Sequence, residues 1–244
     1  MSKSQRKILG VLGGLGPIAT AYFLELTVRM TEADVDQQNL DMIIYNFPSI
    51  PDRTGYILDS TAESPLPGML RVGNALSRQG VSYIAIPCFT AHYFYDELTA
   101  GIPAPIIHGI RETALHLKEN GITTAGLMAT DGTVVSGVFT QELLAAGITP
   151  VLPSKGRQAD VMHLIYRNIK AGTPPEMDRF RAVEQELKDN GAQAIILGCT
   201  ELSLIKRDCS IGPGFLDAME VLARRSVELC GGKLKEEYRC LISK

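Results

Sequence analysis

Two segments of the chain decide the expected fold: Ala85-Ile86-Pro87-Cys88-Phe89-Thr90 and Ile196-Leu197-Gly198-Cys199-Thr200-Glu201. Each begins as a short apolar run typical of a buried strand, reaches a cysteine, and continues into a helical pattern. Upstream of each, a strand runs into a glycine-bearing turn, at residues 7–13 and 123–129. This order predicts two related halves, each with a cysteine at the carboxyl end of a strand. Coincidence between two ordinary strand–turn–helix units is the alternative.

Strand and helix patterns alternate along the chain. The expected strands are 8–12, 42–45, 83–86, 106–108, 124–128, 149–152 and 194–197. Amphipathic helical stretches lie around residues 18–32, 68–79, 109–120, 136–146, 158–171, 176–190 and 217–230. Nearly continuous apolar strands that alternate with helices indicate parallel sheets covered by helices. We therefore expect an α/β protein with two pseudo-symmetric domains, each a mostly parallel sheet flanked by helices.

The division between the two halves is expected near residues 101–105. After Pro213 and Gly214 the chain is expected to return to the first half, so that the last helix completes it. The first half would then comprise residues 1–104 plus 215–244, and the second half residues 105–214.

The composition narrows the class of function. Of the 244 residues, 45% are hydrophobic and 21% are charged, as in an ordinary globular enzyme. The net charge is −3 and no cluster of lysine and arginine stands out, so nucleic acid is not an expected partner. No apolar run approaches the roughly 18 residues that span a bilayer, and the polar residues 1–7 do not predict a signal peptide. We expect no membrane association.

The cysteines and histidines are spaced unlike those of a metal or disulfide site. The five cysteines are Cys88, Cys199, Cys209, Cys230 and Cys240, and no two of them form a Cys-x-x-Cys pair. A reduced, cytoplasmic protein is the simplest interpretation. The four histidines form no pattern typical of metal ligands, so neither a metal nor a cofactor is expected. The last three cysteines are interpreted as structural.

Cys88 and Cys199 are the strongest candidates for chemistry. Ligands of open α/β sheets bind at the carboxyl ends of the strands, and a helix N-terminus placed there favours a thiolate. Either cysteine alone would be interpreted as a small buried hydrophobic residue. Two cysteines in matching positions favour a function, because inversion at a carbon atom needs a base on one face and an acid on the other. A thiolate and a thiol can supply this pair without a cofactor.

The chain resembles the aspartate/glutamate racemase superfamily, and most of all its aspartate racemases. The matching segments are Gly13-Gly14-Leu15-Gly16-Pro17, Ile50-Pro51-Asp52-Arg53-Thr54, Pro87-Cys88-x-Thr90-Ala91-His92, Gly198-Cys199-Thr200-Glu201 and Gly132-Thr133-Val134-Val135-Ser136-Gly137. The resemblance implies two α/β domains with the active site in the cleft between them. It also implies racemisation of a small acidic amino acid by Cys88 and Cys199, independent of pyridoxal phosphate, in a homodimer.

The resemblance also implies the residues that bind the substrate. Arg53 matches an arginine that holds a substrate carboxylate, for which its fork of N–H donors is suited. Thr90, Ala91 and Thr200 match positions that supply hydroxyl and backbone donors. The remaining expected substrate-binding positions are Gly13, Thr130, Phe89 and Ala159.

Two of these positions depart from the family pattern. Phe89 replaces an asparagine, and Ala159 replaces a lysine that precedes Asp160-Val161-Met162. Lys155 and Arg157 lie nearby and are candidates to supply the missing charge. Both changes remove polar contacts, which predicts weaker activity on aspartate or a different substrate.

Three other functions compete with this interpretation. Gly14-Leu15-Gly16-Pro17-Ile18-Ala19 fits a dinucleotide-binding pattern, but Pro17 lacks an N–H and no acidic residue ends the second strand. His92, one helical turn beyond Cys88, could activate it in a cysteine hydrolase, which leaves Cys199 without a role. A binding protein that has lost catalysis is the third alternative, suggested by Phe89 and Ala159.

Overall fold

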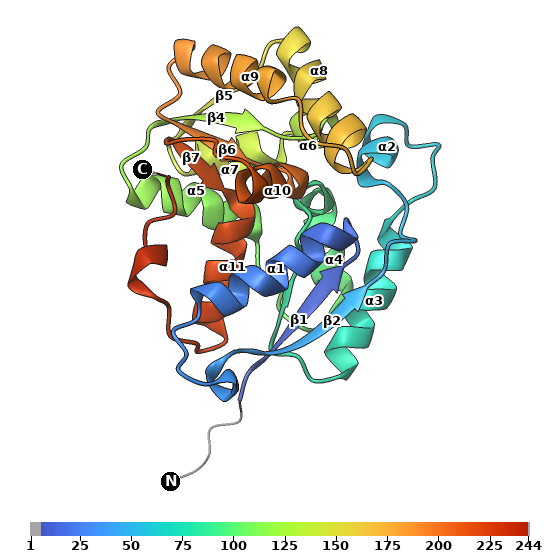
Figure 1. Ribbon diagram of the computed structural model, residues 1–244. Coiled ribbons are helices and arrows are strands. Elements are labelled where there is room, and N and C mark those ends of the chain that lie inside the picture. The colour runs from blue at the N-terminus through green and yellow to red at the C-terminus, as the bar shows by residue number, and fades with distance from the viewer. Residues whose placement is uncertain (1–5, 244) are drawn as a thin grey trace.

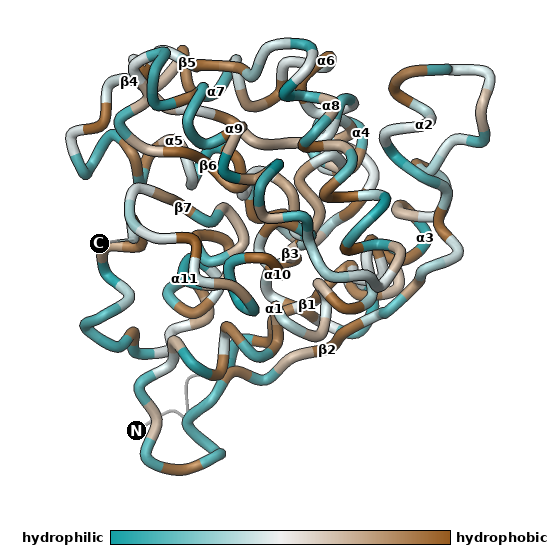
Figure 2. Tube along the Cα trace, turned by 45° about the horizontal axis from the view of Figure 1, so that its top comes forward, coloured by the Kyte–Doolittle hydropathy of each residue, from teal (hydrophilic) through white to brown (hydrophobic). Residues whose placement is uncertain are grey.

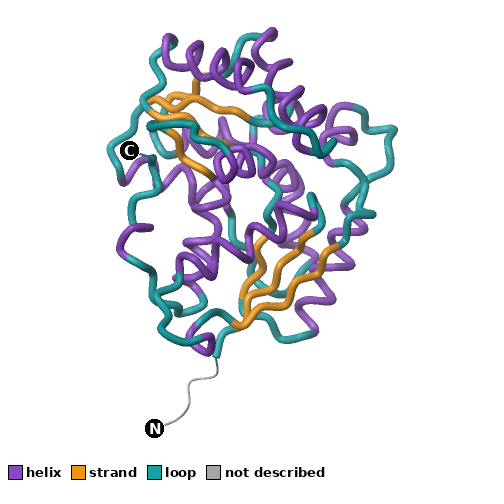
Figure 3. The backbone as a smooth tube through the Cα atoms, in the orientation of Figure 1, coloured by secondary structure: helices purple, strands orange, loops and turns teal. Residues whose placement is uncertain are grey.

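The computed structural model describes residues 6–243, so most of the polar segment 1–7 lies outside the described residues. Its strands form two separate sheets, drawn in orange in Figure 3. The first sheet has the order β2 (Asp41–Asn46), β1 (Ile8–Gly13), β3 (Tyr83–Ala85). The second has the order β5 (Thr149–Val151), β4 (Thr124–Met128), β6 (Ala194–Leu197), β7 (Phe215–Asp217). All neighbouring strands are parallel, as the sequence predicted.

β2, β1 and β3 of the first sheet correspond to β5, β4 and β6 of the second, which has β7 in addition. β1 and β4 are the central strands, and each carries a glycine, Gly10 or Gly126, where a helix approaches closely. A Cβ atom on Gly10 would lie 3.3 Å from Leu76, and one on Gly126 would lie 3.2 Å from Leu187. A larger residue at either position would push the covering helix away from the sheet. The internal repeat in the sequence therefore reflects a shared packing requirement.

Two strands differ from the sequence prediction. The expected strand at 106–108 pairs only at Ile106, which forms an isolated parallel bridge with Ile84 of the first sheet. The helix expected at 217–230 is preceded by β7, which pairs with β6 of the second sheet. These pairings occur close to both crossings between the halves. The division into 1–104 plus 215–244 and 105–214 stays a prediction.

Helices cover both faces of each sheet (Figure 1). α1 (Pro17–Met30), α5 (Gly109–Glu119) and α11 (Ala218–Leu229) pack together between the sheets. α3 (Leu66–Arg78) covers the outer face of the first sheet, while α8 (Lys155–His163) and α9 (Met177–Asp189) lie over the second. The other α-helices are α2 (Arg53–Leu58), α4 (Tyr95–Gly101), α6 (Asp131–Ser136), α7 (Val138–Ala145) and α10 (Thr200–Asp208). Short helices are η1 (Asp36–Gln38), η2 (Phe89–Phe94), the π-helix η3 (Leu164–Ile169) and η4 (Glu236–Tyr238).

One apolar core joins the two halves. Leu9 and Val11 of β1 belong to the same buried cluster as Ala125 and Leu127 of β4. Two further clusters lie on the outer faces of the sheets. Outer loops near both chain ends are mostly hydrophilic, teal in Figure 2. The shared core fixes the ends of β3 and β6 relative to one another. No helix within residues 6–243 has both the length and the apolar character needed to cross a membrane.

Candidate active site

Cys88 and Cys199 occupy equivalent places in the two halves. Cys88 is the N-cap residue of η2, just beyond β3, and Cys199 is the N-cap residue of α10, just beyond β6. Both have extended backbone angles, and each is 6% exposed. They line one small cavity together, with a volume of about 10 Å³. This space holds about one water molecule, so the site is closed in this conformation.

Glu201 is the polar partner of Cys199. The Cys199 Sγ donates to Glu201 Oε2 over 2.9 Å, and the Thr200 hydroxyl lies 3.3 Å from the same oxygen. Burial raises the pKa of Cys199 well above its usual value, and the charge of Glu201 raises it further. Cys199 is therefore a thiol when the site is empty. The motif that predicted Cys199 contains Glu201, but the sequence alone gave no reason to assign Glu201 a separate role.

Arg53 lies beside Cys88 with part of its guanidinium unused. Nη1 donates to the carbonyl oxygens of Ile50 (3.4 Å) and Pro51 (2.9 Å), and Nη2 donates to that of Leu15 (3.0 Å). The buried Nε has no hydrogen-bond partner. Burial lowers the pKa of Arg53, but the neighbouring Cys88 and Asp52 outweigh burial and raise it overall. A fixed guanidinium with free donors in the cavity is suited to a carboxylate.

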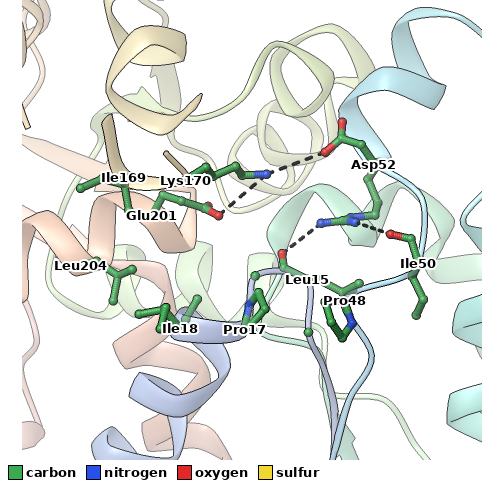
Figure 4. A pocket seen from close by; sticks show the side chains of 14 residues that line it. Leu15, Pro17, Ile18, Pro48, Ile50, Asp52, Ile169, Lys170, Glu201 and Leu204 are labelled. Carbon is green, nitrogen blue, oxygen red and sulfur yellow. Dashed lines mark hydrogen bonds and ion pairs between the residues drawn. The ribbon is translucent and has the colours of Figure 1, made fainter. Parts of the chain in front are cut away.

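Lys170 is a cavity residue that the sequence interpretation missed. Its Nζ lies 3.8 Å from Asp52 Oδ2 and 3.8 Å from Glu201 Oε1, so it bridges the two halves (Figure 4). The same Nζ lies 4.4 Å from the ring centroid of Tyr166, whose hydroxyl is 3.3 Å from both oxygens of Asp52. Burial lowers the pKa of Lys170, but Glu201 and the other nearby acidic groups raise it overall. Lys170 follows the π-helix η3, a feature often found at functional sites.

Three threonine hydroxyls form a buried triangle beside the thiols. The Oγ1 atoms of Thr90, Thr130 and Thr133 lie 3.0 Å from one another. Thr130 also caps α6, and Thr90 and Thr130 line the cavity together with Thr200. The structure therefore gathers three of the predicted substrate-binding threonines around the two cysteines, with Thr133 as an additional partner.

Phe89 lines the same cavity, but its ring belongs to the core between the sheets. The side chain is 1% exposed, and its ring centroid lies 5.7 Å from that of His92 and 5.9 Å from that of Phe139. A Cβ on Gly109 would lie only 3.0 Å from the ring. Phe89 is thus held tightly in place.

The other three predicted positions lie outside the cavity wall. Ala91 is fully buried in the outer core of the first half, and Gly13 ends β1, where a Cβ would lie 2.4 Å from the Thr20 side chain. Ala159 is exposed on α8. Nearby Arg157 is paired with Asp160, and the ammonium group in the cavity comes from Lys170 instead. Roles for these three positions in substrate binding stay predictions.

The His92 ring contacts the backbone of Cys88 and forms no hydrogen bond with the Cys88 thiol. Its Nδ1 lies 3.2 Å from the Cys88 carbonyl oxygen, and its Nε2 accepts from the Gly109 N–H at 3.1 Å. Burial lowers the pKa of His92 to about 3, so the ring is neutral. Both ring nitrogens are occupied by backbone groups, which leaves a Cys88–His92 hydrolase without the thiol–imidazole pair that it needs.

A larger cavity of about 390 Å³ adjoins the cysteine cavity (Figure 4). We call it the vestibule. The two cavities share five wall residues: Leu15, Asp52, Arg53, Lys170 and Glu201. The glycine-rich turn after β1 forms part of its wall. Gly14 has a φ of 91°, and a Cβ there would lie 2.3 Å from the backbone nitrogen of Phe47. The turn therefore packs tightly against the chain after β2, which accounts for its glycines without a nucleotide.

The family of the chain follows from comparison with known proteins. The family model for Asp/Glu/Hydantoin racemase matches residues 12–225, and the chain belongs to this family. The broad specificity amino-acid racemase RacX of Bacillus subtilis (strain 168) is 25% identical over 229 residues, which cover 90% of this chain and 96% of that protein.

Solved structures extend the likeness to the fold. Picrophilus torridus aspartate racemase superposes with a TM-score of 0.85 at 32% identity, covering 96% of this chain and 99% of that one. The glutamate racemase of Francisella tularensis subsp. tularensis SCHU S4, solved with D-glutamate, gives a TM-score of 0.65 at 18% identity. That match covers 92% of this chain and 80% of that one, and it concerns the fold alone. The expected two-sheet α/β fold and the family resemblance are both confirmed.

Proposed function

We propose that the chain racemises an amino acid with two thiols as its acid–base pair and without a cofactor, and that aspartate or a similar acidic amino acid is a substrate. The observation that carries the proposal is the placement of Cys88 and Cys199 at equivalent strand ends around one cavity. Two cysteines from two related halves can act on opposite faces of an α-carbon. The same pair works in both directions, with the roles of acid and base exchanged.

The neighbours of the two thiols differ, which gives each a starting role. The Arg53 guanidinium lies beside Cys88, so we assign Cys88 the role of base in the direction considered first. Cys199 is held as a thiol against Glu201. In one direction the Cys88 thiolate takes the proton from the α-carbon, while Cys199 gives its proton to the opposite face. Cys88 is then a thiol and Cys199 a thiolate, which is the arrangement for the reverse reaction. Glu201 is placed to exchange a proton with Cys199.

The charged residues of the cavity supply the contacts that a substrate needs. The unused donors of Arg53 suit the α-carboxylate, where they also stabilise charge that develops as the α-proton leaves. Lys170 suits a side-chain carboxylate once this replaces Asp52 or Glu201 as its partner. The threonine hydroxyls offer further donors and acceptors beside the α-carbon. This arrangement supports an aspartate-like substrate.

Isotope exchange at the α-carbon tests the proposal. In D₂O the protein should convert L-aspartate into D-aspartate that carries deuterium at the α-carbon, measured by chiral chromatography with mass spectrometry. Cys88→Ser and Cys199→Ser should each abolish the conversion, because a hydroxyl is a far poorer base than a thiol. Cys209→Ser is the matched control, since Cys209 lies outside the cavity wall. Hydroxylamine, which captures pyridoxal phosphate, should not inhibit. Near-normal racemisation by either single active-site variant would overturn the two-thiol scheme.

A further inference from the structure

The vestibule is far larger than the space between the thiols. The cysteine cavity measures about 10 Å³ and the vestibule about 390 Å³, within the range of small-molecule sites. The two cavities adjoin at the five wall residues that they share. A substrate whose α-carbon lies between the thiols can extend its side chain past this layer in one direction, into the vestibule. The volume available there exceeds what the short side chain of aspartate needs.

The vestibule wall is mainly apolar. Pro17 and Ile18 at the start of α1 line it together with Ile169 and Leu204 from the second half (Figure 4). Ile18 is 62% exposed, a high value for an isoleucine that flanks a buried site. Apolar surface that adjoins a catalytic cavity gains free energy when a ligand covers it. The wall is therefore complementary to an aliphatic group.

The charges between the two cavities are balanced before a substrate arrives. Arg53 and Lys170 carry two positive charges there, and Asp52 and Glu201 carry two negative ones. The ammonium group of Lys170 is shared between both acids at 3.8 Å. A zwitterion with a neutral side chain keeps this balance, whereas a side-chain carboxylate must replace an acid that is already paired. Recognition at this site therefore does not depend on an acidic side chain.

From these observations we infer that the vestibule is a side-chain subsite for neutral amino acids with aliphatic side chains about the size of methionine. The inference rests on the proposed two-thiol racemisation and extends its substrates beyond acidic amino acids. Ile18, Ile169 and Leu204 are the residues that select the side chain, and they act by contact with the substrate. The α-carboxylate remains on Arg53, so the reacting atoms keep the same place for every substrate.

The ratio of methionine to alanine turnover tests this subsite. Alanine reaches the thiols but leaves the vestibule empty. Deuterium exchange at the α-carbon should give methionine a kcat/KM about tenfold or more above that of alanine, since each buried methylene contributes about 1–3 kcal/mol, or roughly 10–200-fold. Ile18→Trp should lower this ratio by about tenfold, the order of discrimination that one buried methylene gives, because the larger ring fills space that the methionine side chain would occupy. Ile18→Thr, which keeps the branch at Cβ but shortens the side chain and introduces a hydroxyl, should lower it in the same direction.

Val28→Trp is the matched control. Val28 is also exposed on α1 but lies outside the vestibule wall, so the ratio should stay close to that of the unaltered protein. A methionine rate no higher than the alanine rate, with aspartate exchanged normally, would overturn the subsite and leave the two-thiol scheme intact. An unchanged ratio in Ile18→Trp would do the same. If none of aspartate, alanine and methionine is exchanged, the proposed racemisation fails and the subsite with it.

Discussion

The Cys199 thiol and the Glu201 carboxylate are joined by a buried hydrogen bond of 2.9 Å. This contact gives one thiol of the pair its own proton acceptor. The other thiol, Cys88, has the Arg53 guanidinium beside it. The two cysteines thus occupy equivalent positions in the two halves but have different electrostatic surroundings.

Glu201→Gln is expected to lower kcat/KM by about 10²-fold, the smaller end of the range for a lost acid–base group. The loss should be equal for both enantiomers, because the equilibrium constant of a racemisation is one and fixes the ratio of the two values. The variant also removes a charge that raises the pKa of Cys199. Activity that needs the Cys199 thiol is lost as the pH rises through this pKa. The basic limb of the pH profile should therefore move to lower pH.

Thr200→Val is the control for the loss of Glu201. It removes the weaker 3.3 Å contact to the same carboxylate and leaves the charge in place. Its basic limb should stay where it is in the unaltered protein. A Glu201→Gln profile with an unmoved basic limb would show that the carboxylate does not control Cys199.

Arg53→Ala should reduce kcat/KM by the equivalent of about 2–5 kcal/mol, the cost of removing one partner of a desolvated charge pair. The same change frees three backbone carbonyl groups, so the midpoint of thermal unfolding should fall as well. Arg53→Lys keeps the charge but loses the fork of donors. Added guanidinium ions should partly restore the activity of Arg53→Ala if the residue acts on the substrate. Full activity of Arg53→Ala in the absence of guanidinium ions would show that Arg53 does not hold the substrate.

Lys170→Met should impair aspartate more than alanine. The change removes the ammonium group that we assign to the side-chain carboxylate, so the KM for aspartate should rise by about tenfold, the effect of roughly 1.4 kcal/mol. Alanine has no such carboxylate, and its KM should change less. Lys155→Met is the matched control, because Lys155 begins α8 and lies outside both cavities. Equal effects of Lys170→Met on both substrates would mean that Lys170 only shapes the cavity.

The sequence predicted those features of the fold and the site that depend on local residue patterns. The apolar strand patterns, each followed by a cysteine, predicted the parallel sheets. They also predicted that Cys88 and Cys199 lie at one site, and both line the same cavity. β7 was missed because three residues after Gly214 are too few to show a strand period. Its pairing with β6 depends on a partner far away in the sequence. Lys170 was missed for a related reason. Lys170 directly follows the π-helix η3, at a position that a regular helical period would not single out.

The departure at Phe89 leads to a prediction on both substrate choice and stability. Phe89→Asn restores the residue that the family resemblance implies and should raise the preference for aspartate over alanine, because an amide can bond a substrate where a ring cannot. The ring is also packed between His92 and Phe139. Its loss should cost about 3 kcal/mol of folding free energy and lower the unfolding midpoint by about 6–12 °C.

Ala159→Lys provides the comparison. This second reverting change lies on the exposed face of α8, outside both cavities, so we expect it to alter neither quantity. Aspartate and alanine turnover should be measured for each variant and for the pair, together with thermal unfolding. If the unaltered protein already racemises aspartate efficiently and neither variant gains, these positions do not set the substrate preference. A gain only in the double variant would instead mean that the two departures are one coordinated change.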